Sequence, residues 1–187
     1  MPISEVKIPH IETPRLILRG PRPEDFAPML AMWQDPEVLT YFHSTGFSRE
    51  DVWGRYLRIF GMWAVMGFGF FVVEDKASGA FAGVAGVFDT KRELDPPVPE
   101  GMPEAGWVLA RAFHGKGYGT ECMQAVFAWA DEALNGPEIF CIMNPENQGS
   151  IRVAEKCGFA PWYICEHGGH PTKVMRRAPH GKPVTVA

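Results

Sequence analysis

The stretch FHGKGYGTEC, residues 113–122, brings three glycines, a lysine and a threonine together just ahead of a segment with helical apolar spacing. Glycines let a backbone approach an anion closely, and the first N–H groups of a helix lack acceptors within the helix. The spacing is not that of a P-loop, because Gly117 follows Lys116 and position 110 is Ala110. It is not that of a dinucleotide-binding fingerprint either, because the third glycine would fall at Thr120 or Cys122. Two interpretations stay open: a pyrophosphate cradle, to which Thr120 adds a hydroxyl, and a turn that only joins a strand to a helix.

The cysteines and histidines do not form a recognisable metal site. The four cysteines include no CxxC pair and lie in apolar surroundings, which predicts small buried thiols: Cys122, Cys141, Cys157 and Cys165. In CEHGGHP, His167 and His170 flank a glycine turn, but no fourth ligand stands at a useful spacing. We therefore expect no metal cofactor.

Length and composition indicate one ordinary globular domain, expected to span residues 1–187. The 187 residues are 46% hydrophobic and 21% charged, with a formal net charge of -4. This charge implies no general affinity for nucleic acid or for an anionic membrane, and it slightly favours cationic substrates, although the placement of charge matters more than the sum. The chain start lacks the features of a signal peptide and no apolar run is long enough to span a membrane, so we expect a cytoplasmic protein.

The glycine segment must be positioned by the strands and helices around it. Apolar periodicity predicts a strand at 15–20, a helix within 22–38 opened by Pro23, and a helix at 48–65 capped by Ser48. Further strands are expected at 68–75, 79–88, 104–110, 138–144, 160–167 and 172–178, and further helices at 118–135 and 147–158. Residues 90–103 contain four prolines and predict a surface loop that is functional or mobile. The order predicts an α+β (mixed α/β) fold with helices on both faces of one sheet.

Two segments in this order, EAGWVLARAFHGKGYGTECMQAVFAWAD and NPENQGSIRVAEKCGF, resemble the GCN5-related N-acetyltransferase (GNAT) family. The closer resemblance is to the branch that acetylates the N-terminal amines of ribosomal proteins, and it extends over about 13–178. The family's pyrophosphate motif, Q/R-x-x-G-x-G/A, is matched from His114 to Gly119, with histidine in place of the usual first residue. The resemblance implies a mostly antiparallel sheet in which two parallel strands splay apart.

The resemblance implies acetyl coenzyme A as donor and a direct attack of an amine on its thioester. The pantetheine arm would lie between the splayed strands, bonded to backbone groups of the first one, and Asn147 would help to hold it. The residues expected to bind the donor are Trp107, Val108, Leu109, His114, Gly115, Lys116, Gly117, Tyr118, Gly119, Thr120 and Asn147.

Catalytic roles are implied for Glu104 and Ser150. Glu104 begins the strand before the cradle, where the family often places a general base, but a solvated or salt-bridged glutamate at a strand end is an equal alternative. Many family members use a tyrosine on the last long helix to protonate the leaving thiolate, and that position is Ala154 here. Ser150, in an N-x-x-S motif that begins with Asn147, is the branch's replacement, although both residues are also good helix caps.

The acceptor is the part of the function that the sequence defines least. Trp53 and Tyr56 are expected on the acceptor side, while core packing is the alternative use of their aromatic segment. A peptide or protein N-terminus and a small amine are both compatible acceptors. A non-catalytic acyl-CoA-binding sensor or scaffold of the same fold is the alternative function, and a homodimer is possible because dimers are common in the family.

Overall fold

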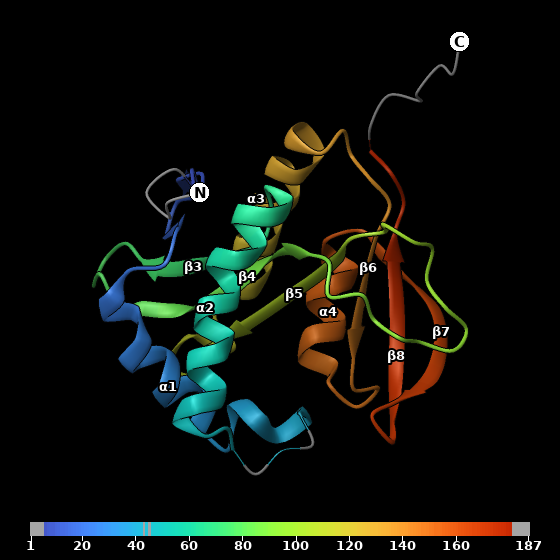
Figure 1. Ribbon diagram of the computed structural model, residues 1–187, viewed down its shortest axis with the longest axis horizontal. Helices are drawn as coiled ribbons and strands as arrows, with labels where there is room; N and C mark the ends of the chain where they lie inside the picture. Colours follow the sequence, from blue (N-terminus) through green and yellow to red (C-terminus); the bar gives the residue numbers. More distant parts are fainter. Residues whose placement is uncertain (1–5, 43, 45, 181–187) are drawn as a thin grey trace.

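The protein forms one eight-stranded sheet, seen in a computed structural model that describes residues 6–42, 44 and 46–180 (Figure 1). The strand order is β1-β2-β3-β4-β5-β6-β8-β7, and every neighbouring pair is antiparallel except β5 and β6. The strands are β1 Ile11–Glu12, β2 Leu16–Arg19, β3 Phe70–Asp75, β4 Phe81–Phe88, β5 Glu104–Leu109, β6 Ile139–Met143, β7 Phe159–His167 and β8 His170–Arg177. The predicted α+β class is thereby confirmed.

Four α-helices connect and cover these strands: α1 Phe26–Gln34, α2 Arg49–Met66, α3 Tyr118–Ala133 and α4 Gln148–Lys156. α2 begins with a complete capping box, in which Ser48 Oγ accepts from the Asp51 N–H at 3.0 Å and Asp51 accepts in return from the Ser48 N–H. α2 ends at Gly67, whose φ of 75° is the left-handed conformation typical of a helix stop. The predicted helices are therefore present, with ends that differ by a few residues.

The helices bury both faces of the sheet. All eight residues of β4 are buried, which requires cover on both sides. In Figure 1, α1 and α2 lie in front of β3 and β4, and α3 lies behind them. Phe71 of β3, which has no exposed surface, contacts Trp129 of α3 with ring centroids 5.5 Å apart. The apolar core is consequently continuous from α3 through the sheet to α1 and α2.

A buried charge cluster fixes the start of α1 against the sheet. Arg19 of β2 donates from both terminal nitrogens to Asp25, at 2.7 and 2.9 Å, and from Nε to Glu74 of β3 at 2.7 Å. Asp25 ends a 3-10 turn, Pro23–Asp25, that precedes α1 and that periodicity alone did not separate from the helix. The first covering helix is thus tied to two strands by one guanidinium group.

The single parallel pair of strands separates almost at once. β5 and β6 pair only at Glu104 and Phe140, where the Phe140 N–H donates to the Pro103 carbonyl at 3.1 Å. Beyond that point β5 stays paired to β4 along its whole length but leaves its other edge open. This geometry confirms the predicted splay.

The loop from Thr90 to Pro103 is packed rather than detached. Leu94 and Met102 are buried in a second apolar cluster with Phe140 and Val174. The Tyr163 hydroxyl of β7 also donates to the Pro96 carbonyl at 2.8 Å. The loop therefore lies against its own sheet, next to the start of β5 (Figure 1).

Candidate active site

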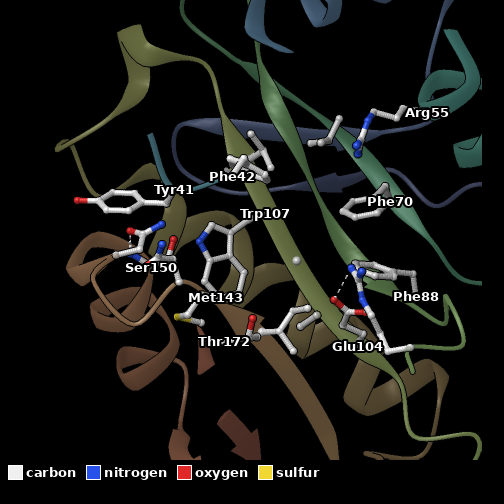
Figure 2. A pocket seen from close by; sticks show the side chains of 18 of the residues that line it. Tyr41, Phe42, Arg55, Phe70, Phe88, Glu104, Trp107, Met143, Ser150 and Thr172 are labelled. Carbon is white, nitrogen blue, oxygen red and sulfur yellow. Dashed lines mark hydrogen bonds and ion pairs between the residues drawn. The ribbon is translucent and has the colours of Figure 1, made fainter. Parts of the chain in front are cut away.

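A cavity of about 530 Å³ lies where β5 and β6 separate. Its walls come from α1, α2, the sheet strands β3 to β6, the start of α4 and the β7–β8 turn. In the view of Figure 2, Arg55, Phe70, Phe88 and Glu104 lie to one side of Trp107, and Tyr41 and Ser150 lie to the other. A pocket of this size bounded by many elements is typical of a small-molecule site.

The glycine segment leads directly into α3 and has the backbone conformation that glycine permits. Gly115 and Gly117 have φ angles of 71° and 81°, and Gly117 is the N-cap of the helix. Arg15 braces the turn, donating from Nη1 to the Lys116 carbonyl at 2.9 Å and lying 4.3 Å from the centre of the Tyr118 ring. The predicted glycine turn is therefore present, and Arg15 supports it.

The N–H groups at the start of α3 remain available to an anion. The first bond within the helix is from the Glu121 N–H to the Gly117 carbonyl, so the preceding N–H groups of the first turn have no helical acceptor. Tyr118 uses its hydroxyl to donate to Asp75 at 3.0 Å, and Lys116 Nζ donates to the Ala112 carbonyl at 2.8 Å. These two side chains hold the turn and leave the N–H groups at the start of the helix without an acceptor there.

His114 stabilises the end of β5. Its Nε2 lies 2.8 Å from the Leu109 carbonyl oxygen, which can only accept, so the ring nitrogen donates. The Ala110 N–H donates to the Ala82 carbonyl at 2.8 Å, and strand alternation then turns the backbone groups of Val108 toward β4 and those of Trp107 and Leu109 toward the gap. Although residue 114 is a histidine and departs from the family pattern, its side chain supports the end of β5 and thereby the open edge of that strand.

Asn147 and Ser150 begin α4 at the opposite side of the gap. Asn147 is the N-cap, and its Oδ1 accepts from the Ser150 N–H at 3.0 Å. The Ser150 hydroxyl makes no hydrogen bond with the part of the chain that the structure describes, and the residue lines the cavity. Asn147 therefore performs the capping role, and Ser150 presents an unused hydroxyl.

Glu104 lies at the start of β5, in the floor of the cavity. Only 3% of it is exposed, and it accepts two hydrogen bonds from Arg92, at 2.8 and 3.0 Å, and one from Thr90 at 3.1 Å. Both donors come from the proline-rich loop. The sequence located Glu104 but not Arg92, because an ion pair across a loop has no periodic signal.

The face of α2 that lines the cavity is not the one expected. Arg55, Arg58, Ile59 and Met62 line it, at the i, i+3, i+4, i+7 spacing of one helical face. The structure does not bring Trp53 and Tyr56 into this cavity. They stack on each other at 5.3 Å on the neighbouring face and meet Phe26, with Tyr56 buried and Trp53 46% exposed.

No group of three or more metal-ligating side chains occurs among residues 6–42, 44 and 46–180. His167 and His170 line the cavity at the β7–β8 turn. Cys122 and Cys141 are buried as expected, whereas Cys157 and Cys165 are half-buried. Burial raises the pKa of Cys157 to about 11, so its thiol stays protonated near neutral pH. Within the same described ranges, no helix has the length and apolar character needed to cross a membrane.

Comparison with known proteins identifies the class to which this fold and site belong. The model of the acetyltransferase (GNAT) domain matches residues 15–160. Among curated proteins, YkkB of Bacillus subtilis is 27% identical over 93% of this chain and 91% of its own. An uncharacterised N-acetyltransferase of Bacillus licheniformis, p20, is 27% identical over 79% of this chain and 80% of its own. A putative GnaT-family acetyltransferase structure from Bordetella pertussis has a TM-score of 0.79 at 26% identity, covering 91% of this chain and 100% of the other.

The chain belongs to the GNAT acetyltransferase family, as predicted. It is an acetyltransferase that uses acetyl coenzyme A as donor. The residues present fit this donor, because the glycine turn offers unpaired N–H groups to a diphosphate and the open edge of β5 offers backbone groups to the amides of a pantetheine arm.

Proposed function

We propose that this protein is an N-acetyltransferase that transfers the acetyl group to a primary amine, either a peptide or protein N-terminus or a small amine. The observation that carries the proposal is the cavity at the β5–β6 gap, because residues of the open strand β5, where the donor would lie, and side chains of α2 line it together. Acetyl coenzyme A supplies an activated acyl carbon. The amine nitrogen attacks that carbon, the C–S bond breaks, and coenzyme A leaves as the thiolate, which then takes up a proton.

We propose two catalytic groups in this chain. Glu104, at the acceptor end of β5, would take the proton of the attacking amine directly or through one water molecule. Ser150, with its unused hydroxyl, would donate to the leaving sulfur. The backbone groups of Leu109, on the open edge of β5, would bond the pantetheine arm, away from the Glu104 end where the amine attacks. Ala154 stands where many relatives have the tyrosine donor, and it is fully buried, so no side chain there reaches the sulfur.

The test is the release of free coenzyme A from acetyl coenzyme A in the presence of a mixed pool of peptides and amines, with mass spectrometry of the products. We expect an N-acetylated product. Ser150→Ala and Glu104→Gln should each lower kcat by about tenfold or more, while the shift in melting temperature caused by acetyl coenzyme A stays nearly unchanged.

Gln148→Ala, at an exposed position on the same helix turn as Ser150, is the matched control and should keep full activity. Turnover that is unaffected by Glu104→Gln would remove Glu104 from the mechanism. A protein that is stabilised by acetyl coenzyme A but acetylates no member of the pool would contradict the proposed transfer to amines. A homodimer and a cytoplasmic location stay predictions, for light scattering and fractionation to check.

A further inference from the structure

The acceptor half of the cavity is rich in positive charge, although the whole chain carries a formal net charge of -4. The charged and histidine side chains that line the cavity are Arg55, Arg58, Arg92, Glu104, His167 and His170. Three arginines thus face one glutamate, and that glutamate is already held by Arg92. Arg55 and Arg58 make no ion pair with a carboxylate of the described residues.

Arg55 is fixed in place rather than free to move into solvent. Its guanidinium carbon lies 4.7 Å from the centre of the Trp33 ring and 4.1 Å from that of Phe47. Burial and the positive charge of Arg58 lower the pKa of Arg55, and the attraction of Asp51 offsets them only in part. A half-buried cation with aromatic contacts and no ion pair would gain from an anionic partner.

The phosphates of the donor are not that partner. They belong at the glycine turn, beyond Leu109, whereas Arg55 and Arg58 line the same cavity as Glu104, a cavity to which no residue of the glycine turn contributes. Five steps along β5 separate Glu104 from Leu109 by about 17 Å. The arginines therefore serve the space that the acceptor enters.

From these positions we infer that the acceptor carries an anionic group, a carboxylate or phosphate, beside its reactive amine. This inference rests on the proposed function and narrows it. The amine is directed toward Glu104, and the anion toward Arg55 and Arg58 on the facing helix. Arginine suits this role because its planar group can donate two parallel hydrogen bonds to an oxyanion. Polycationic amines are disfavoured in the same space.

The test compares three matched series of linear primary amines of graded length, whose far end is a carboxylate, an amide or an ammonium group. We expect kcat/KM to be about tenfold higher for the best carboxylate than for its amide, and lower again for the diamine. The corresponding aminophosphonates distinguish phosphate from carboxylate as the preferred anion. Equal rates for the three series, or a preference for the diamines, would overturn the inference while leaving acetyl transfer intact.

Variants of α2 connect the preference to the arginines. Arg58→Gln should abolish most of the discrimination between carboxylate and amide, and Arg58→Glu should reverse it. Arg55→Lys keeps the charge at 55 and should retain a reduced preference, which separates the loss of charge from the loss of packing. Arg49→Gln, on the same helix but outside the cavity, is the control and should change nothing.

A binding measurement keeps the inference independent of turnover. Calorimetric titration of the same three series is done on protein saturated with coenzyme A. Tighter binding of the carboxylates, lost in Arg58→Gln, supports the inference even if no series is acetylated, and that result would refute only the proposed transfer. Equal binding of the three series would refute the inference alone.

Discussion

Glu104 and Arg92 show how a single pair of side chains joins a loop to the site. The Glu104 carboxylate is almost fully buried, whereas the Arg92 side chain keeps 31% of its surface exposed. Removing one partner leaves a buried charge without compensation, which costs more than the pair itself contributes. The pair therefore controls both the position of the candidate base and the packing of the loop above it.

We predict that Arg92→Gln lowers the free energy of unfolding by about 2 kcal/mol, because it strands the Glu104 carboxylate. The double variant Arg92→Gln/Glu104→Gln should recover most of this loss, since two amides can bond to each other and no charge remains. Urea denaturation of the four proteins of this cycle measures the coupling. Additive losses in the double variant would show that the pair is not coupled in the folded protein.

At the same scale, the sequence identified some site residues and missed others for physical reasons. The glycines of the cradle were found because a φ above zero and close backbone approach restrict a position to glycine. Glu104 was found through the family resemblance, which implies a general base at the start of the strand before the cradle. Arg55 and Arg58 were missed because apolar periodicity identifies only the aromatic, buried face of α2. Which neighbouring face lines the cavity depends on the tertiary structure.

At the scale of elements, the junction between β5 and α3 depends on left-handed glycines. We predict that Gly117→Ala weakens the binding of acetyl coenzyme A and lowers the free energy of unfolding by about 1 kcal/mol, because its φ of 81° strains any residue with a side chain. Thermal shift with and without the donor measures both effects.

Gly61, in the middle of α2, provides the matched comparison. A Cβ built there meets no atom within 4 Å, and its φ is not positive. Gly61→Ala should therefore stabilise the protein by about 0.5–1 kcal/mol without changing the affinity for the donor. If both substitutions behaved alike, the explanation through the φ angle would be wrong.

The elements themselves were largely predictable, and their connections were less so. The four helices and the main strands follow from periodicity and capping residues such as Ser48, whose capping box is present. The two-residue β1 and the 3-10 turns carry too few residues for a period to appear. The fixed position of the proline-rich loop was also missed, because it depends on Leu94 and Met102 reaching a cluster formed by distant strands.

At the scale of the whole molecule, carboxylates hold the glycine turn against the sheet and should make the fold sensitive to acid. Hydrogen bonds from Ser78 and Tyr118 hold the pKa of Asp75 below its usual 3.8. Burial opposes the ionisation of Glu121, but hydrogen bonds from Thr13 and Arg15 outweigh it and keep its pKa below 4.5. Both groups bind protons more readily in the unfolded chain than in the folded one.

We therefore predict that the stability from these carboxylates is complete above their usual values and is lost as the pH falls from 4.5 and 3.8 toward the lower folded-state values. Urea denaturation across the acid range measures the slope. Glu121→Gln should flatten part of it, and an unchanged slope in that variant would contradict the assignment. Affinity for acetyl coenzyme A should decline over the same range, because Arg15 and Tyr118 lose the partners that steady the turn.

The separation of β5 from β6 also bears on aggregation. A row of unpaired backbone groups in the middle of a sheet is an internal edge. Like the edge strand of a sheet, it offers N–H and C=O groups with which a strand of another chain can pair. Here the residues of that edge line a cavity, together with the start of α4 and aromatic side chains, so these neighbours limit the approach of an extended segment of another protein. The cavity that admits the pantetheine arm should therefore also hinder aggregation through this edge.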